Sequence, residues 1–391
     1  MVARLAGAAV AATDASSGKR HGWGSVIAAA LAIPGISAAQ TELVQGQSAV
    51  GIKWMNYRDW QPGLDRIRVN SPAFWVSTPI NNEWNVEGTA TLDSLSGASP
   101  RYHTAVSGAS RMSDERRAGD VKITRIADRS SWSVGVAASN ENDYRSRAIS
   151  GQARWSTEDN NRTWNMGVGV TSDRIGSTDA PSLDERRRTV ELTAGVTQAL
   201  SRADLVQLAV TYAAGKGYYS DPYKSPDYRP DFRNRVSVTL RWNHHLENWD
   251  TTLRSSYRIY RDSFGVRSHT VSLESVVSLG PRFQITPSIR LYTQDAARFY
   301  YNPIYSYTGT PYPADYSATS PPYISADQRL SAFGAIALGL KFAVQLGDGW
   351  TADIKLERYQ QRSGWHLIQP GSRGLAPFSA SYVQWGLMRQ F

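Results

Sequence analysis

The feature that most constrains the fold is a series of segments, each of about ten residues, in which apolar and polar side chains alternate. In the segment from Trp164 to Val170, for example, Trp, Met and Val alternate with Asn and Gly. A period of two is typical of a strand with two different faces. About ten residues is also the length that a tilted strand needs to cross a membrane, whereas a soluble sandwich alternates over shorter strands.

The links between these segments favour a membrane barrel over a soluble sandwich. Counting over residues 49–391 gives about sixteen strands, within a range of 14 to 18. Their links mostly alternate between short ones, such as 280–282, and long ones, such as 97–114 and 298–326. Short periplasmic turns, long extracellular loops and an even strand number are typical of outer-membrane barrels. We therefore predict an all-β, transmembrane antiparallel barrel that forms a single domain over residues 40–391.

Aromatic residues occur near both ends of the predicted strands. The tryptophans near the short turns are Trp75, Trp84, Trp132, Trp155, Trp164, Trp242, Trp249, Trp350 and Trp385. Tyrosines at the opposite end are Tyr218, Tyr219, Tyr223, Tyr228, Tyr300, Tyr301, Tyr305 and Tyr307. Because amphipathic rings favour the interface between lipid and water, this pattern predicts two aromatic girdles.

The first 39 residues have the features of a cleavable secretory signal. A basic stretch at Lys19-Arg20-His21 precedes an apolar segment over residues 26–36, and Ser37-Ala38-Ala39 supplies small residues before Gln40. After this segment no apolar run approaches the roughly 20 residues of a membrane-spanning helix. We therefore predict a signal peptide over residues 1–39 and localisation in the outer membrane of a Gram-negative bacterium, in contact with its lipid.

The composition argues against several other classes of protein. The chain has no cysteine, so it has no disulfide, thiolate metal site or lipid-anchor cysteine. Its net charge is +9, but the arginines are spread along the strands and no nucleic-acid motif accompanies them, so we predict no nucleic-acid partner.

The segment over residues 379–391 alternates on two faces and ends on Phe391. In this it resembles the last strand of bacterial outer-membrane barrels. We expect it to pair with the first strand, and we expect Phe391 to be part of the assembly signal that the barrel-assembly machinery recognises.

Several short motifs run through the chain. They are DSLSGAS at 93–99, GASR at 108–111 with Asp114 and Arg116 following, DPYK at 221–224, YRIYRD at 257–262, SHT at 268–270, RLY at 290–292 and DQRLSAFG at 327–334. With these motifs the chain resembles the domain of unknown function 3570 family over roughly residues 45–391. The resemblance implies an exported β-barrel and supplies no established activity or catalytic residue. Members are often encoded beside flavin-transfer and thioredoxin-like proteins, which implies a role next to an envelope redox system.

Charged residues fall on the predicted inner faces of the strands. The candidate lumen-lining residues are Arg233, Arg235, Arg241, Arg254, Arg258, Arg290, Lys341, Lys355, Glu274, Asp353 and Glu357. Charges are costly against lipid and tolerable in a wet lumen. They predict either a lattice of salt bridges that braces the strands and fills the barrel or a basic ladder that passes or holds anions.

The link over residues 298–326 is rich in tyrosine and proline. Its candidate binding residues are Tyr300, Tyr301, Tyr305, Tyr307 and Tyr312. Aromatic faces on a stiff backbone suit stacking on sugars or planar ligands, or a constriction at the mouth. The alternative is a loop that packs on its neighbours and shields the rim.

Enzyme motifs are not evident in the sequence. His244, His245, His269 and His366 lack metal-ligand spacing. Adjacent Ser268 and His269 would point to opposite faces of a strand and so form no nucleophile–base pair. We predict no catalytic residue, metal or cofactor. Two functions remain: a channel for small anionic solutes, or a non-enzymatic scaffold for an envelope redox partner.

Overall fold

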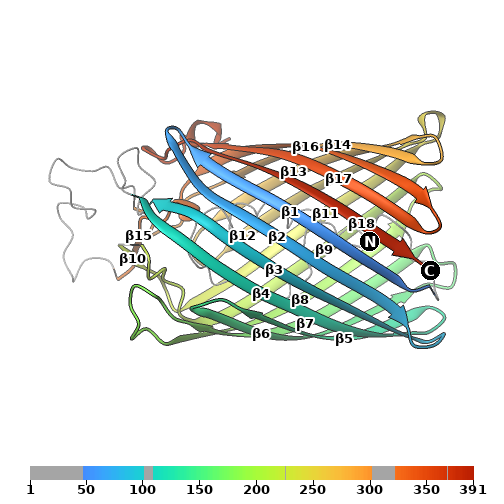
Figure 1. The fold of residues 1–391 in the computed structure, drawn as a ribbon, viewed down its shortest axis with the longest axis horizontal. Helices are drawn as coiled ribbons and strands as arrows, with labels where there is room; N and C mark the ends of the chain where they lie inside the picture. Colours follow the sequence, from blue (N-terminus) through green and yellow to red (C-terminus); the bar gives the residue numbers. More distant parts are fainter. Residues whose placement is uncertain (1–46, 101–108, 225, 302–321, 368) are drawn as a thin grey trace.

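The computed structural model describes residues 47–100, 109–224, 226–301, 322–367 and 369–391. Within these ranges sixteen strands close into one barrel in which every neighbouring pair is antiparallel, and the last strand lies beside the first (Figure 1). The predicted sixteen-stranded barrel is therefore confirmed. The predicted signal segment, 1–39, lies outside the described residues.

The barrel strands follow one another in sequence order around the wall, and β10 and β15 form a separate two-stranded sheet. The strands are β1 (Ala49–Gln61), β2 (Leu64–Pro79), β3 (Trp84–Pro100), β4 (Ala109–Ile126), β5 (Ser130–Asn140), β6 (Tyr144–Ser156), β7 (Arg162–Ile175), β8 (Glu185–Ala199), β9 (Asp204–Gly217), β10 (Asp227–Tyr228), β11 (Phe232–Leu246), β12 (Thr251–Asp262), β13 (Arg267–Leu279), β14 (Phe283–Gln294), β15 (Ile324–Ser325), β16 (Phe333–Gly347), β17 (Trp350–Arg362) and β18 (Phe378–Gln390). The described part of the chain also contains three short 3-10 helices, η1 (Glu247–Trp249), η2 (Gln328–Leu330) and η3 (Ser363–Trp365). In the described ranges we find no helix with the length and apolar character needed to cross a membrane.

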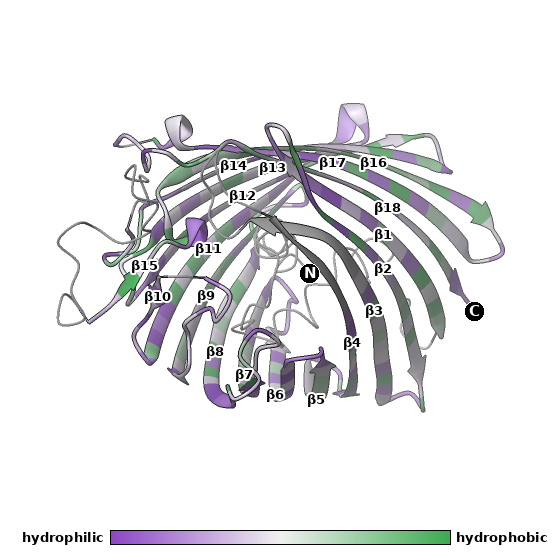
Figure 2. Cartoon of the chain, turned by 60° about the vertical axis from the view of Figure 1, so that its left-hand side comes forward, coloured by the Kyte–Doolittle hydropathy of each residue, from purple (hydrophilic) through white to green (hydrophobic). Residues whose placement is uncertain are grey.

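The period-two sequence pattern gives most strands an apolar outer face and an inner face on which small and polar residues predominate, and the alternation of hydropathy along the strands is visible as bands in Figure 2. In β5, Trp132, Val134 and Val136 are 60%, 59% and 54% exposed. Ser133 and Gly135 lie between them on the inner face. A continuous outer surface of exposed apolar side chains is the surface that lipid covers in a membrane barrel.

The links differ between the two ends of the barrel, which we call the turn end and the loop end. At the turn end, β16 and β17 are joined by Asp348 and Gly349, with positive φ of 48° and 76°, as a type I′ hairpin turn requires. The link between β13 and β14 at the same end is also short, at 280–282. At the loop end the longer links are 176–184, 218–231, 295–332 and 363–377.

The predicted bounds of one long loop, 97–114, are wrong. β3 and β4 continue to pair through most of the 97–114 segment, up to Pro100 opposite Ala109. The segment is rich in Ser, Gly and Ala, which gives little alternation, but backbone pairing between strands does not require apolar side chains.

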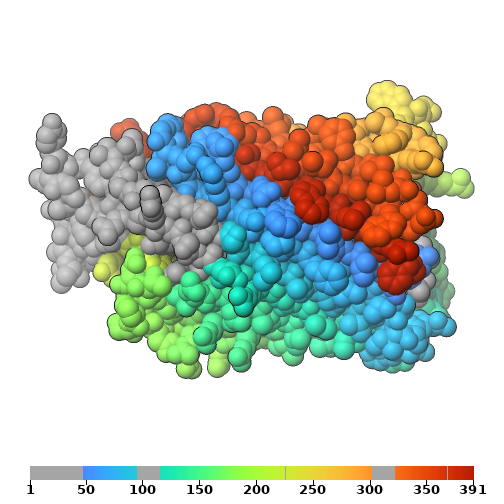
Figure 3. Space-filling view, viewed as in Figure 1, coloured from blue at the N-terminus to red at the C-terminus, as the bar shows by residue number. Residues whose placement is uncertain are grey.

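The seam between β1 and β18 closes the barrel, with pairs running from Ala49 opposite Gln390 to Trp60 opposite Ser379. Figure 3 shows the first and last barrel strands adjoining on the outer surface, β1 in blue and β18 in red. Across the seam the rings of Trp54 and Trp385 stack with centroids 5.8 Å apart. The predicted pairing of the last strand with the first is confirmed.

The tryptophan pattern holds for most, but not all, of the residues expected in a girdle. Trp132, Trp242 and Trp249 are exposed near the turn end. Trp75 is an exception, at 5% exposed, because it shares the inner face of β2 with Ala73 and Ser77 while Phe74 points outward. Its prediction as a girdle residue is therefore wrong.

Candidate functional site

All eleven candidate lumen-lining residues lie on the inner face of the barrel wall. On β11, Val236, Val238 and Leu240 are exposed outward, so the residues of opposite parity point inward. The inward candidates are Arg233, Arg235 and Arg241 on β11, Arg254 and Arg258 on β12, Glu274 on β13, Arg290 on β14, Lys341 on β16, and Asp353, Lys355 and Glu357 on β17. Their position faces the lumen; their role in conduction stays a prediction.

Three of these arginines form a ladder along β11 and β12, which we call the arginine ladder: Arg241, Arg254 and Arg258. The register places Arg254 opposite Asn243, Arg241 opposite Ser256, and Arg258 opposite Thr239. These pairs occupy three successive inward rows of the two strands, and each row holds one guanidinium. Along the barrel wall the positive charge therefore lies on β12, then on β11, then on β12 again.

The neighbours of the arginine ladder are mainly neutral. On the β9 side, Nη1 of Arg241 donates to Oε1 of Gln207 at 2.8 Å, and Thr239 faces Ala209. On the β13 side, Arg258 lies opposite Thr270, and Glu274 is the acid opposite Arg254. The wall at the ladder is therefore locally basic.

Further round the wall, on β14 and β17, the inward charges are paired. Glu357 accepts from Nη2 of Arg290 at 2.8 Å and from the Tyr382 hydroxyl at 3.0 Å, and it lies 3.2 Å from Nζ of Lys355. Lys53 and Asp353 approach at 4.0 Å. This part of the wall has the character of the bracing lattice.

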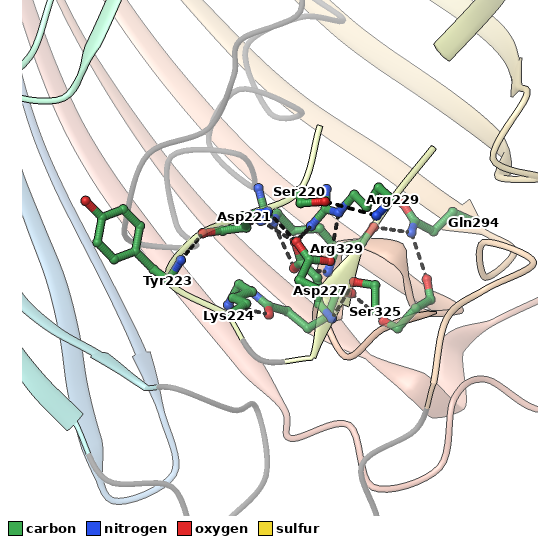
Figure 4. Close-up of polar contacts among 12 residues, drawn as sticks. Ser220, Asp221, Tyr223, Lys224, Asp227, Arg229, Gln294, Ser325 and Arg329 are labelled. Atoms are coloured by element: carbon green, nitrogen blue, oxygen red, sulfur yellow. Dashed lines mark hydrogen bonds and ion pairs between the residues drawn. The ribbon is translucent and has the colours of Figure 1, made fainter. Parts of the chain in front are cut away.

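The sequence patterns did not indicate a cluster of buried and partly buried charges at the loop end, which we call the ion cluster: Asp221, Asp227, Arg229, Asp327 and Arg329. Figure 4 labels all of these residues except Asp327. The first three come from the link between β9 and β11, and the other two from the link between β14 and β16. The pairing of β10 with β15 brings these two links together.

The contacts within the ion cluster run between both links. Arg229 donates to Oδ1 of Asp227 at 2.9 Å and to Oδ2 of Asp327 at 2.5 Å. Arg329 donates to Oδ1 of Asp327 at 2.8 Å and to Oδ2 of Asp221 at 2.9 Å. Three carboxylates thus share two guanidinium groups, with Lys224 close by and hydrogen-bonded to Gln328 at 3.3 Å.

Burial raises the pKa of Asp221 to about 7, and the nearby carboxylates of Asp327 and Asp227 act in the same direction against the opposing charges of Lys224 and Arg229. A signal for the cluster was present in the sequence, since Asp221 belongs to the DPYK motif and Asp327 and Arg329 to DQRLSAFG. The motifs did not indicate that these residues meet.

Aromatic side chains next to the ion cluster turn inward. Tyr219 packs against the ring of Phe264, and the guanidinium carbon of the inward Arg187 lies 5.1 Å from the Tyr219 centroid. A Cβ at Gly215, on the inner face of β9, would collide with the Tyr219 hydroxyl. The loop-end link between β9 and β11 therefore covers part of the inner wall.

The predicted tyrosine girdle is wrong for these residues. Tyr219 faces inward, and the hydroxyl of Tyr223 donates to Oδ2 of Asp143 at 2.5 Å and accepts from the backbone N–H of Thr178 at 2.7 Å. Tyr219 and Tyr223 therefore contact other loop-end residues instead of facing lipid.

The tyrosine-rich link is only partly described. Tyr300 packs against the buried cluster of Phe264, Val266, Ala297 and Leu330, and the backbone N–H of Tyr301 donates to the Ser325 carbonyl at 2.7 Å. Tyr305, Tyr307 and Tyr312 lie outside the described residues. The ligand-binding role of this set stays a prediction.

Phe391 lies just beyond β18 at the turn end and is 63% exposed. Its backbone N–H donates to the Ser48 carbonyl at 2.9 Å, and its carbonyl accepts from Ser48 at 3.0 Å. Its role as an assembly signal stays a prediction. Across the described residues we find no group of three or more His, Cys, Asp or Glu side chains placed to hold a metal ion.

A family model described as "Protein of unknown function (DUF3570)" matches residues 104–184 and 177–381. The chain belongs to this family. The DUF3570 match includes the arginine ladder and the ion cluster. No curated protein matches the chain.

Comparison with solved structures shows which folds the DUF3570 chain is similar to. A bacterial polysaccharide outer membrane secretin aligns with a TM-score of 0.51 and 11% identity, over 89% of this chain and 99% of that one. The siderophore receptor PirA from Pseudomonas aeruginosa aligns with a TM-score of 0.44 and 12% identity, over 81% of this chain and 56% of that one. The PirA receptor from Acinetobacter baumannii gives 0.44 and 8%, over 83% and 55%. The chain thus spans little more than half the length of these receptors, and the secretin likeness establishes an outer-membrane barrel fold alone.

Proposed function

We propose that the chain is a non-enzymatic outer-membrane channel that favours small anionic solutes. The observation that supports this proposal is the arginine ladder, with one inward guanidinium in each of three successive rows of β11 and β12.

A lumen wall that carries one sign of charge concentrates ions of the opposite sign and lowers the barrier to their passage. The paired charges on β14 and β17 largely neutralise one another, so they contribute little to the sign of the field. The ladder has Gln, Ala and Thr as its neighbours on β9 and β13, apart from Glu274, and it therefore supplies the net positive field that an anion would meet.

Conductance of the purified chain in planar bilayers tests this proposal. In a salt gradient, the unmodified chain is expected to give open-channel steps with a reversal potential of anion-selective sign. Arg254→Gln/Arg258→Gln removes two positive charges from the ladder and is expected to move the permeability ratio of anion to cation toward unity while steps persist.

The matched control is Arg261→Gln/Arg267→Gln, which makes the same charge change at two exposed, outward positions of β12 and β13. Its selectivity should equal that of the unmodified chain. Selectivity that is unchanged in the ladder variant, or a bilayer that stays silent with correctly folded protein, would contradict the channel. A silent bilayer would leave the scaffold for an envelope redox partner as the remaining hypothesis, with co-purification as its measurement.

A further inference from the structure

The outer face of β6 to β9 carries a dense group of cations at the loop end, which we call the basic rim patch: Arg145, Arg147, Arg174, Arg186, Arg188 and Lys216. Each of these side chains is exposed and points away from the lumen, because its strand neighbours, such as Ser146, Asp173 and Arg187, are buried on the inner face. The basic rim patch is thus separate from the arginine ladder.

The strand register concentrates these charges into rows. Arg145 lies opposite Arg174, and Arg174 lies opposite Arg186, so three guanidinium-bearing residues face one another on adjacent strands. In the next outward row toward the turn end, Arg147 lies opposite Ser172, which lies opposite Arg188, and Arg188 lies opposite Lys216.

Like charges directly opposite one another destabilise a sheet. Asp184 neutralises Arg174 in part, through bonds of 2.6 and 2.9 Å, and Glu185 begins β8 beside it. Six cations against these two acids leave an excess of positive charge that an external anion would relieve.

The position of the basic rim patch along the strands shows which layer of the membrane lies beside it. The next outward residues toward the turn end are Ile149, Val170 and Val190, which are exposed and apolar. From Trp164 near the turn end, Arg174 lies about 33 Å along β7, at about 3.3 Å per residue. For a strand tilted by about 40° this corresponds to about 25 Å along the membrane normal, which is the height of the apolar band of such barrels. The cations therefore lie at the level of lipid headgroups.

We propose that the basic rim patch binds the phosphate groups of an anionic lipid in the outer leaflet. Guanidinium groups hold phosphate through paired hydrogen bonds, and two adjacent rows suit a headgroup with more than one phosphate. The acyl chains of the same molecule would lie against Ile149, Val170 and Val190. Inorganic phosphate would use the cations but not this apolar surface, so the patch is a lipid site.

Binding of diphosphorylated lipid A to the full chain in neutral detergent tests the inference, with dephosphorylated lipid A as the comparison. The unmodified chain is expected to bind the diphosphorylated form much more tightly, and to bind it more weakly as salt rises. The variant Arg145→Gln/Arg174→Gln/Arg186→Gln removes one row. At about 1 kcal/mol for each cation near an anionic surface, its binding should weaken about 100-fold.

The control Arg125→Gln/Arg129→Gln/Arg202→Gln makes the same charge change at exposed positions of the turn end, and should bind like the unmodified chain. Heat-modifiable gel migration establishes that each variant is folded. If the row variant does not fold, the comparison of the two lipids on the unmodified chain decides alone. Equal binding of both lipids, unchanged binding by the folded row variant, or full displacement of lipid by millimolar inorganic phosphate would each overturn the proposal.

Discussion

Asp327 is the residue on which the ion cluster most depends. Its side chain is fully buried, and it accepts hydrogen bonds from Arg229, from the guanidinium of Arg329 and from the backbone N–H of Arg329. The two arginine side chains are only 8% and 15% exposed. Removing one member of a buried ionic group leaves its partners uncompensated, at a cost of about 3–5 kcal/mol.

We therefore expect Asp327→Ala to release the loop-end links while the barrel itself remains folded, because Asp327 belongs to no barrel strand. Limited proteolysis should cut within residues 218–231 at least about 100-fold faster when opening is fast relative to cleavage. Asp184→Ala is the control, since its pair with Arg174 is more than half exposed and such pairs contribute about 0–1 kcal/mol. Equal protection of both variants would show that the cluster does not hold the links.

At the scale of the structural elements, the ion cluster makes the stability of one contact depend on pH. This is the contact of the link between β9 and β11 with the link between β14 and β16. The pKa of Asp221 is raised by burial from an ordinary 3.8 to about 7 in the closed arrangement. Between these two values the closed arrangement keeps a proton that an opened, solvated Asp221 would lose. The closed arrangement is therefore most stable below about pH 4, loses stability as pH rises toward about 7, and changes little above that.

Hydrogen exchange of the amides of Tyr223 and Ser325, corrected for intrinsic rates, should therefore show greater protection at pH 5 than at pH 8. Asp221→Asn cannot lose a proton and still accepts from Arg329, so this variant should show a much flatter pH profile. Protection that increases with pH in the unmodified chain would contradict the assignment of Asp221.

At the scale of the whole molecule, the sequence predicted what depends on local pattern. The number of strands and the face on which each side chain lies follow from alternation, as for Val236, Val238 and Leu240. Alternation is a local property of the sequence and does not depend on residues far away in the chain. The ion cluster could not be predicted in this way, since Asp221 and Arg329 are 108 residues apart and meet only when two links pack together. The prediction for Trp75 fails for a different reason. Its distance from the turn suggests a girdle residue, but the alternation along β2 places its side chain on the inner face.

The closing seam leads to a prediction about assembly. Phe391→Ala keeps the backbone bonds to Ser48 and removes a side chain that is 63% exposed, so the finished barrel should melt at nearly the same temperature. If Phe391 is part of the signal for the barrel-assembly machinery, the amount in the outer membrane should fall. Leu346→Ala, at a position that is 60% exposed near the same end, should reach normal levels. Normal levels of both variants would end this hypothesis.

The ion cluster also has a consequence for the order of events during folding. Arg229 and Asp327 are 98 residues apart, and β11 to β14 lie between them along the wall. The contacts between the two links, Arg229 with Asp327 and Arg329 with Asp221, can form only after these four strands have paired in their final register. A slip of one strand by a single residue would turn its side chains to the other face and would separate the two links. We therefore expect these contacts to form late in folding. Protection of the amides of the two links from hydrogen exchange would then report that β11 to β14 have paired in the correct register.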